Sequence, residues 1–114
     1  MTEQEIKKLR KEKQRVIEVL PPLDEIMRGT FIKCYLECIR ANCKCHKGKR
    51  YRHGPYYRVS YGKAGRMHHV YVPIRMKNQV KKWTENYIKL WEAIEKISEF
   101  NIQIIRLKKR CLRK

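Results

Sequence analysis

The sequence has few acidic residues and distributes them unevenly. It holds 11 Asp and Glu against 29 Lys and Arg, which gives a formal net charge of +18. No acidic residue occurs between Glu37 and Glu85, whereas thirteen Lys or Arg lie in that interval. A chain this basic repels itself unless polyanions neutralise it, and nucleic acid is the usual polyanion for such a protein. The missing carboxylates also argue against a nuclease, which needs acidic metal ligands.

Long apolar runs are also missing. No stretch approaches the roughly eighteen residues that a membrane helix needs, and the first residues contain no apolar core of a signal peptide. The five cysteines are an odd number, and four of them lie between Cys34 and Cys45. This pattern disfavours a secreted disulfide framework. We therefore expect a cytoplasmic protein with reduced thiols and no membrane association.

Four side chains in a short polar segment have the chemistry of a structural zinc site. Their spacing is C-x4-C-x-C-x7-H, and thiolate sulfur and imidazole nitrogen are the ligands that structural zinc prefers. Cysteines surrounded by lysines are also poorly explained as buried apolar side chains. The fourth ligand is open between His53, Cys34 and His46, of which His46 is disfavoured because it is adjacent to another ligand. The predicted ligands of a structural Zn2+ are Cys38, Cys43, Cys45 and His53.

The pattern of apolar residues predicts an α+β fold, and 114 residues suit a single domain. Apolar residues recur at helical spacing from residue 2 to about residue 20, which predicts a helix. Pro21-Pro22 end this helix. The predicted parts are an N-terminal helical segment at 1–28, a zinc-stabilised three-stranded antiparallel sheet at 29–73, and a long coiled-coil helix with a basic tail at 74–114.

Three short strands are expected in the middle segment. Alternating side chains indicate strands at about 31–37, 56–61 and 66–72, with a four-residue loop at 62–65 between the last two. Strict alternation gives this sheet one apolar face and one face that is polar and aromatic. The apolar face would hold Ile32, Leu36, Val70 and Val72, and the other face Lys33, Tyr35, Tyr56, Arg58, His69 and Tyr71.

Apolar residues in the last third of the chain follow a heptad, as is typical of a coiled coil. Asn101 falls at a core position, where a buried amide fixes register and strand number. The partner is either the N-terminal helix or the same helix of a second chain. The long helix, of about 34 residues, exceeds what the shorter one can cover, so we expect a homodimer. The heptad residues are Val80, Trp83, Tyr87, Leu90, Ile94, Ile97, Asn101 and Ile104.

Basic and aromatic side chains are interleaved in and after the cysteine-rich segment. Arginine and lysine engage phosphates, while tyrosine rings stack on bases or pack against sugars. Paired strands can enter a DNA groove, and no RNP-type signature is present, so double-stranded DNA is favoured over RNA. The expected nucleic-acid contacts are Lys44, Lys47, Lys49, Arg50, Arg52, Tyr56, Arg58, Lys63 and Arg66.

No catalytic constellation is recognisable in the sequence. It shows no nucleophile with its base, no glycine-rich phosphate loop and no carboxylate pair, so we do not expect an enzyme. The alternative to nucleic-acid binding is a coiled-coil assembly or adaptor protein whose basic head docks on a polyanion.

The segment between Gly29 and Pro73 carries several short motifs. The most specific is His53-Gly54-Pro55-Tyr56-Tyr57, and the others include Cys43-Lys44-Cys45 and Val70-Tyr71-Val72-Pro73. Over about residues 26 to 105, the chain resembles a family of short prokaryotic proteins catalogued as a domain of unknown function. The resemblance implies a shared fold and the metal site described above. It also implies a role as an accessory or regulator of a mobile element, because some members are encoded near such elements.

Overall fold

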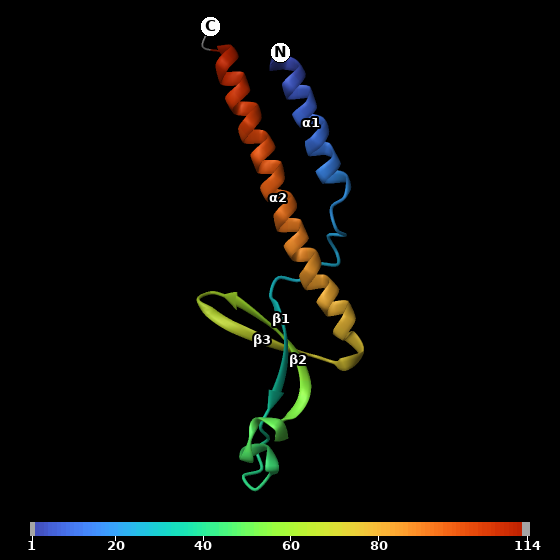
Figure 1. Cartoon of the computed structure of the whole chain (residues 1–114), viewed down its shortest axis with the longest axis vertical. Helices are drawn as coiled ribbons and strands as arrows, with labels where there is room; N and C mark the ends of the chain where they lie inside the picture. The colour runs from blue at the N-terminus through green and yellow to red at the C-terminus, as the bar shows by residue number, and fades with distance from the viewer. Residues whose placement is uncertain (1, 113–114) are drawn as a thin grey trace. The chain divides into compact units, whose positions relative to one another are not determined.

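The computed structural model describes residues 2–112 and follows the predicted order of helix, sheet and helix (Figure 1). This order confirms the α+β fold: an N-terminal helix, a three-stranded antiparallel sheet with a Cys/His cluster in its first turn, and a long C-terminal helix. The elements are α1 (Thr2–Glu18), β1 (Thr30–Leu36), β2 (His53–Lys63), β3 (Arg66–Val72) and α2 (Lys77–Leu112).

The chain divides into two compact units. The helical unit contains the chain up to Glu25 and from Asn86 onward, and the sheet unit is Ile26–Glu85. The expectation of a single domain stays a prediction. Neither helix, over the residues described, is long and apolar enough to cross a membrane.

In the helical unit, α1 runs antiparallel to the C-terminal half of α2 (Figure 1). The ammonium of Lys13 donates a hydrogen bond of 2.9 Å to the side-chain oxygen of Asn101. Ile6 of α1 and Ile104 of α2 are both buried. The helix α1 is thus a partner of α2 within one chain, which is one of the two pairings that the heptad allowed.

The inward-facing stripe of α2 differs from the predicted heptad. Ile94 and Asn101, which the heptad places in the core, are exposed, whereas their neighbours Ala93 and Phe100 are partly shielded. Asn101 is therefore not a buried amide that sets register, and its side chain accepts the bond from Lys13 at the surface. The prediction failed because the apolar stripe of α2 is wider than a single coiled-coil seam. The helix can therefore turn inward the residue before each predicted core position and still bury apolar area.

The sheet has the strand order β1-β2-β3, with both pairs antiparallel. Ile32 lies opposite Arg58, and Arg58 lies opposite Tyr71. Directly opposite residues point to the same side of a sheet, so Ile32 shares a face with Arg58 and Tyr71 rather than with Val70 and Val72. The predicted faces are thus right for β2 and β3 and wrong for Ile32 and Lys33 of β1, because a register shift of one residue moves a side chain to the opposite face. The register changes again between Cys34 and Leu36, so that Leu36 lies opposite His53.

One face of the sheet is covered, within the sheet unit, by the first turns of α2. Tyr57 and Val59 point to this side and are buried, as is Val80 of α2. The ammonium of Lys77 lies 5.0 Å from the centroid of the Tyr57 ring. Lys33, expected on the polar face, lies opposite Tyr57 and so shares this covered face. The other side carries Ile32, Tyr56, Arg58, Ser60, His69 and Tyr71. It is termed the open face because Tyr56, His69 and Tyr71 are exposed, although Ser60 is buried.

The turn between β2 and β3 is tighter than predicted. The strands reach Lys63 and Arg66, so the loop is Ala64-Gly65 rather than residues 62–65. Both loop residues have positive φ, at 54° and 76°, as in the type I′ turn that matches strand twist. The sequence did not indicate this turn because alanine rarely adopts positive φ.

Candidate metal centre and basic surface

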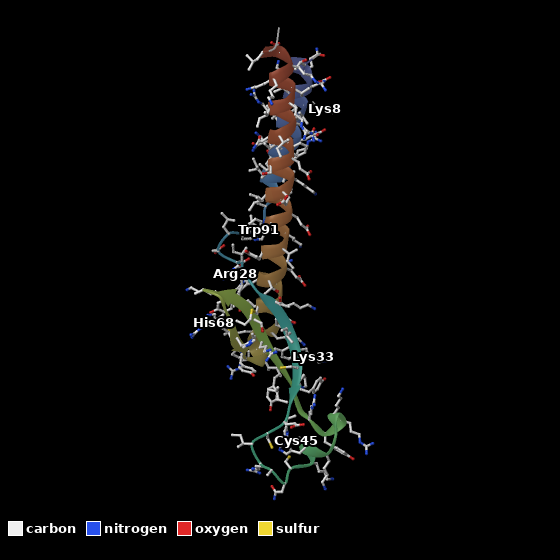
Figure 2. All side chains as sticks on the ribbon, turned by 90° about the vertical axis from the view of Figure 1, so that its left-hand side faces the viewer. Lys8, Arg28, Lys33, Cys45, His68 and Trp91 are labelled. Atoms are coloured by element: carbon white, nitrogen blue, oxygen red, sulfur yellow. The ribbon has the colours of Figure 1, made fainter. Side chains whose placement is uncertain are left out.

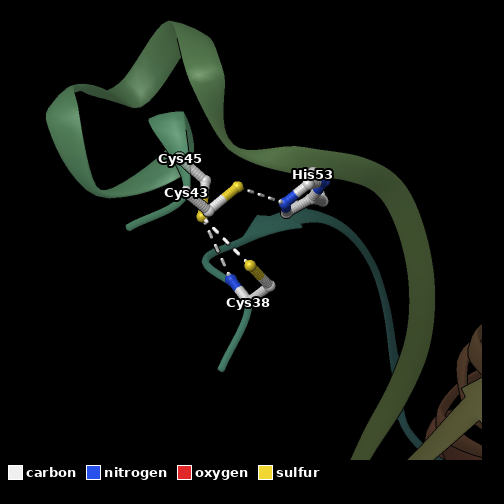
Figure 3. Close-up of side chains that lie close together, drawn as sticks. All are labelled: Cys38, Cys43, Cys45 and His53. Atoms are coloured by element: carbon white, nitrogen blue, oxygen red, sulfur yellow. Dashed lines mark hydrogen bonds between the residues drawn. The ribbon is translucent and has the colours of Figure 1, made fainter. Parts of the chain in front are cut away.

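The segment between β1 and β2, termed the cysteine turn, carries three of the four predicted metal ligands, and β2 supplies the fourth. Cys38 follows the end of β1, and Cys43 precedes a short 3-10 helix that contains Cys45. His53 is the first residue of β2. Figure 3 shows the four side chains gathered in one place, although three come from the cysteine turn and one from β2.

Gly54 allows β2 to begin close to β1. Its φ is +143°, and a Cβ atom at this position would lie 2.9 Å from the carbonyl oxygen of Cys34. A residue with a side chain would be strained here, both in its backbone and by this contact. The start of β2 therefore stays beside the end of β1, which places His53 over the cysteine turn.

The spacing of the donor atoms fits a bound metal ion. All four lie within 4.8 Å of one another. The two sulfurs of Cys38 and Cys45 are 3.6 Å apart, and the sulfur of Cys43 is 3.4 Å from Nε2 of His53 (Figure 3). Ligand atoms around a tetrahedral ion with bonds of about 2.0–2.3 Å lie about 3.3–3.8 Å apart. The residues present can therefore hold a metal ion once the more widely spaced donors move closer together.

Two of the thiols differ in how readily they lose a proton. A hydrogen bond from the backbone N–H of Cys45, together with the contact to His53, lowers the pKa of Cys43 to about 6. Burial raises the pKa of Cys45 to about 11, because the thiolate would lose its hydration. The backbone N–H of Cys38 also donates to the sulfur of Cys45, at 3.2 Å. A bound dication favours the thiolate, so metal binding must displace the proton of Cys45.

The two alternative ligands lie outside the cluster. Cys34 is part of β1, where it lies opposite Tyr56. His46 instead approaches Glu37, with Nδ1 3.2 Å from a carboxylate oxygen. Within residues 2–112, the group of donors close enough to share an ion includes His53 and neither alternative.

The nine predicted nucleic-acid contacts do not form one surface. Two residues, Tyr56 and Arg58, lie on the open face of the sheet. Lys63 and Arg66 lie opposite each other at the hairpin end, and alternation along β2 directs them to the side of Val59. The remaining five are exposed around the cysteine turn, at the end of the sheet marked by Cys45 in Figure 2: Lys44, Lys47, Lys49, Arg50 and Arg52.

Carboxylates neutralise little of this positive charge. Of the thirteen Lys and Arg between Arg40 and Lys82, Arg52 alone has a carboxylate oxygen within 4.0 Å among residues 2–112. That oxygen belongs to Glu37 and lies 3.9 Å away. The sheet unit therefore presents its cations to solvent largely unpaired.

The open face also contains residues that were not predicted as part of a site. Tyr71 is 56% exposed and lies opposite Arg58. On the same face, Nδ1 of His69 is 2.7 Å from the hydroxyl oxygen of Ser60. Alternation placed Tyr71 and His69 on the same predicted polar face as Arg58, and this was the available signal that they could belong to a binding surface.

Comparison with protein-family models matches residues 4–82 to a domain of unknown function (DUF6788). This span contains all three strands and the four donors of the metal cluster. Comparisons with curated proteins and with solved structures give no match.

Proposed function

This chain belongs to the family of a domain of unknown function (DUF6788), and we propose that it is a zinc-stabilised, basic protein that binds nucleic acid. The proposed partner is DNA ahead of RNA, because the sheet lacks the RNP-type signature of RNA-binding sheets. The proposed role is binding rather than catalysis. A role beside a mobile element is supported by the sequence resemblance alone, and tighter binding to DNA of an adjoining element than to unrelated DNA would test it.

The observation that carries this proposal is the segregation of charge between the two units. The sheet unit holds fifteen Lys and Arg against two Glu, whereas the rest of the chain holds fourteen against nine acidic residues. Charge needed only for solubility would be mixed in sign over the whole surface. A concentrated excess that few carboxylates neutralise is the electrostatic footprint of a protein that binds phosphates.

Zinc suits the cluster because three thiols and one imidazole are ligands of closed structural zinc sites. The protein supplies four donors, whereas a catalytic zinc keeps one position for water or substrate. In this proposal the metal holds the cysteine turn in one conformation. The lysines and arginines of that turn then lose less conformational freedom when they contact phosphates.

The salt dependence of DNA binding tests the proposal. Each phosphate that the protein neutralises contributes about −0.9 to the slope of log affinity against log salt on duplex DNA, and about −0.7 on single strands. We expect a straight line whose slope corresponds to several phosphates, measured by fluorescence anisotropy with labelled DNA. A slope near zero, or no binding at low salt, contradicts the proposal.

Two variants with equal changes in charge locate the binding surface. The first replaces four arginines of the sheet unit by glutamine: Arg50, Arg52, Arg58 and Arg66. The control makes the same change at four exposed arginines of the helical unit: Arg10, Arg15, Arg106 and Arg110. The first variant should lose affinity by roughly a hundred-fold, and the control by a few-fold at most. Both should keep their metal and helix content, and equal losses would show that the sheet unit is not the binding surface.

Dimerisation through α2 is a further part of the proposal. Four apolar side chains of α2 in the helical unit are between 47% and 58% exposed: Ile88, Trp91, Ile102 and Ile105. A second copy of the helix would bury them in a symmetric coiled coil. Sedimentation velocity should show a dimer that Ile102→Lys combined with Ile105→Lys converts to a monomer. A monomeric wild-type protein would exclude this arrangement.

The same exposed residues favour a second candidate function, in which a coiled-coil adaptor docks on any polyanion through its basic head. In that case inorganic polyphosphate of matched charge should bind as tightly as DNA. Under the nucleic-acid proposal DNA should bind more tightly, because bases and sugars add contacts that polyphosphate lacks.

A further inference from the structure

The open face of the sheet brings two exposed aromatic rings next to one arginine. Tyr71 lies directly opposite Arg58 on the neighbouring strand. Tyr56 lies two residues before Arg58 on β2, so both side chains point to the same side. Tyr56 is 44% exposed and Tyr71 is 56% exposed, whereas Tyr57 on the covered face is 8% exposed. The rings are thus accessible on either side of a cation.

The side chain of Arg58 has an unmet hydrogen-bonding requirement. Its Nε atom is buried and has no hydrogen-bond partner among residues 2–112. Buried polar atoms in folded proteins nearly always have a partner, and an arginine pairs best with the two oxygens of a phosphate or carboxylate. The sheet unit is strongly basic and holds only two acidic residues, so the charge of Arg58 is complementary to an external anion. Such an anion would meet the terminal nitrogens of the guanidinium, because Nε itself is shielded from solvent.

Tyr56 also lines two hollows of the sheet unit. One hollow lies beside the metal cluster and is lined by Arg40, Cys43 and His53 as well as by Tyr56. The other is lined by Tyr56 and Tyr71 together with Pro73, and it also reaches Tyr57 and Val72, so it lies at the strand ends between the two faces. A group that enters either hollow therefore lies next to Tyr56, and in the second hollow it also lies next to Tyr71.

We infer that the open face binds single-stranded nucleic acid, with bases stacked on Tyr56 and Tyr71 and a phosphate held by Arg58. This inference rests on the proposed function and specifies the strand state of the ligand. Base faces inside a duplex are covered by neighbouring bases, so exposed tyrosine rings can stack only on unpaired bases. The pattern of paired strands in the sequence favoured double-stranded DNA, whereas the exposed tyrosines favour a single strand.

Binding of a labelled oligonucleotide of about twelve thymidines, compared with a duplex of the same length, tests this inference. We expect tighter binding of the single strand at equal salt. Tyr71→Ile should weaken single-strand affinity by roughly ten-fold and leave the salt slope unchanged, because a stacking contact is lost without a phosphate contact. Tyr71→Phe keeps the ring and should bind within about two-fold of the wild type.

The matched control is Tyr35→Ile. Tyr35 is 47% exposed, and its ring centroid lies 5.8 Å from the ammonium of Lys33, a residue of the covered face. This variant should retain single-strand affinity. If Tyr71→Ile fails to fold, as judged by metal content and circular dichroism, Tyr56→Ile tests the same stacking on the other side of Arg58.

Three outcomes overturn the inference. The first is a duplex that binds as tightly as the single strand, or more tightly, while the arginine variants still lose affinity. That result leaves nucleic-acid binding intact and excludes the single strand. The second is an equal loss in Tyr71→Ile and Tyr35→Ile, and the third is a Tyr71→Phe variant as weak as Tyr71→Ile. Absence of salt-dependent binding to either strand form removes the proposed function itself.

Discussion

The Nε2 atom of His53 lies 3.4 Å from the sulfur of Cys43, ten positions away in the chain. Cys43 belongs to the cysteine turn and His53 begins β2, so this contact closes the turn onto the sheet. On the strands themselves, among the residues described, the buried apolar side chains are Tyr57 and Val59. A core this small supplies little folding free energy, and metal binding at the cluster would add to it.

Removal of the metal should loosen the sheet unit before the helical unit. The four donors all belong to the sheet unit, whereas α1 packs on α2 without them. After addition of a strong chelator, hydrogen exchange should accelerate at the amides of β1 and β2 and stay slow in α1. Simultaneous acceleration in both units, or no change in either, would contradict a structural role for the metal in the sheet unit.

Two cysteine variants should differ sharply in metal affinity. Cys43→Ser removes a ligand and should weaken binding by at least about a hundred-fold in a competition titration with a chromophoric chelator. Cys34→Ser changes a partly buried thiol outside the cluster and should bind as the wild type does. His46→Ala should also bind normally. If Cys34→Ser or His46→Ala were the variant that loses the metal, the ligand set would be wrong.

Metal binding should release protons near neutral pH. The thiol of Cys43, with its pKa lowered to about 6, is largely ionised at about pH 7. The thiol of Cys45, with its pKa raised to about 11, keeps its proton until the metal displaces it. Apparent affinity should therefore rise with pH, by up to about ten-fold per unit for this one proton. Calorimetry in buffers of different ionisation heat counts the protons, and a count of zero would contradict the assignment of Cys45.

Two glycine substitutions should destabilise the sheet unit unequally. At Gly29, with φ of +148°, a Cβ atom would lie 2.5 Å from the side chain of Val59. Gly29→Ala should therefore lower the free energy of unfolding by about 2–4 kcal/mol. Gly65 has φ of +76° but no atom near its Cβ position, so Gly65→Ala should lower it by only about 1 kcal/mol. Urea unfolding of the metal-loaded protein measures both, and equal effects would show that the contact with Val59 is relieved at little cost.

The elements and the metal cluster were predictable because each has a local signal. The heptad and the alternating strands are periodic in the sequence, and cysteine and histidine identify metal ligands by their chemistry. The face assignment of β1 was not predictable. It depends on pairing with β2, where Ile32 lies opposite Arg58, and alternation within β1 is equally consistent with either side.

Two further details lay beyond the sequence for physical reasons. The heptad placed Asn101 in the core, but the position of α1 decides which part of a wide apolar stripe is shielded, and Phe100 is shielded instead. The open face depends on cross-strand neighbours, so the pairing of Tyr71 with Arg58 required the register of β2 and β3.

The metal content of protein purified without chelator tests the central claim most directly. Elemental analysis should find one zinc ion per chain in the wild type and almost none in Cys45→Ser. The sulfur of Cys45 is a ligand whichever residue supplies the fourth donor. A wild-type protein without metal, or a Cys45→Ser variant with an equal zinc content, would contradict the zinc centre on which the proposed function depends.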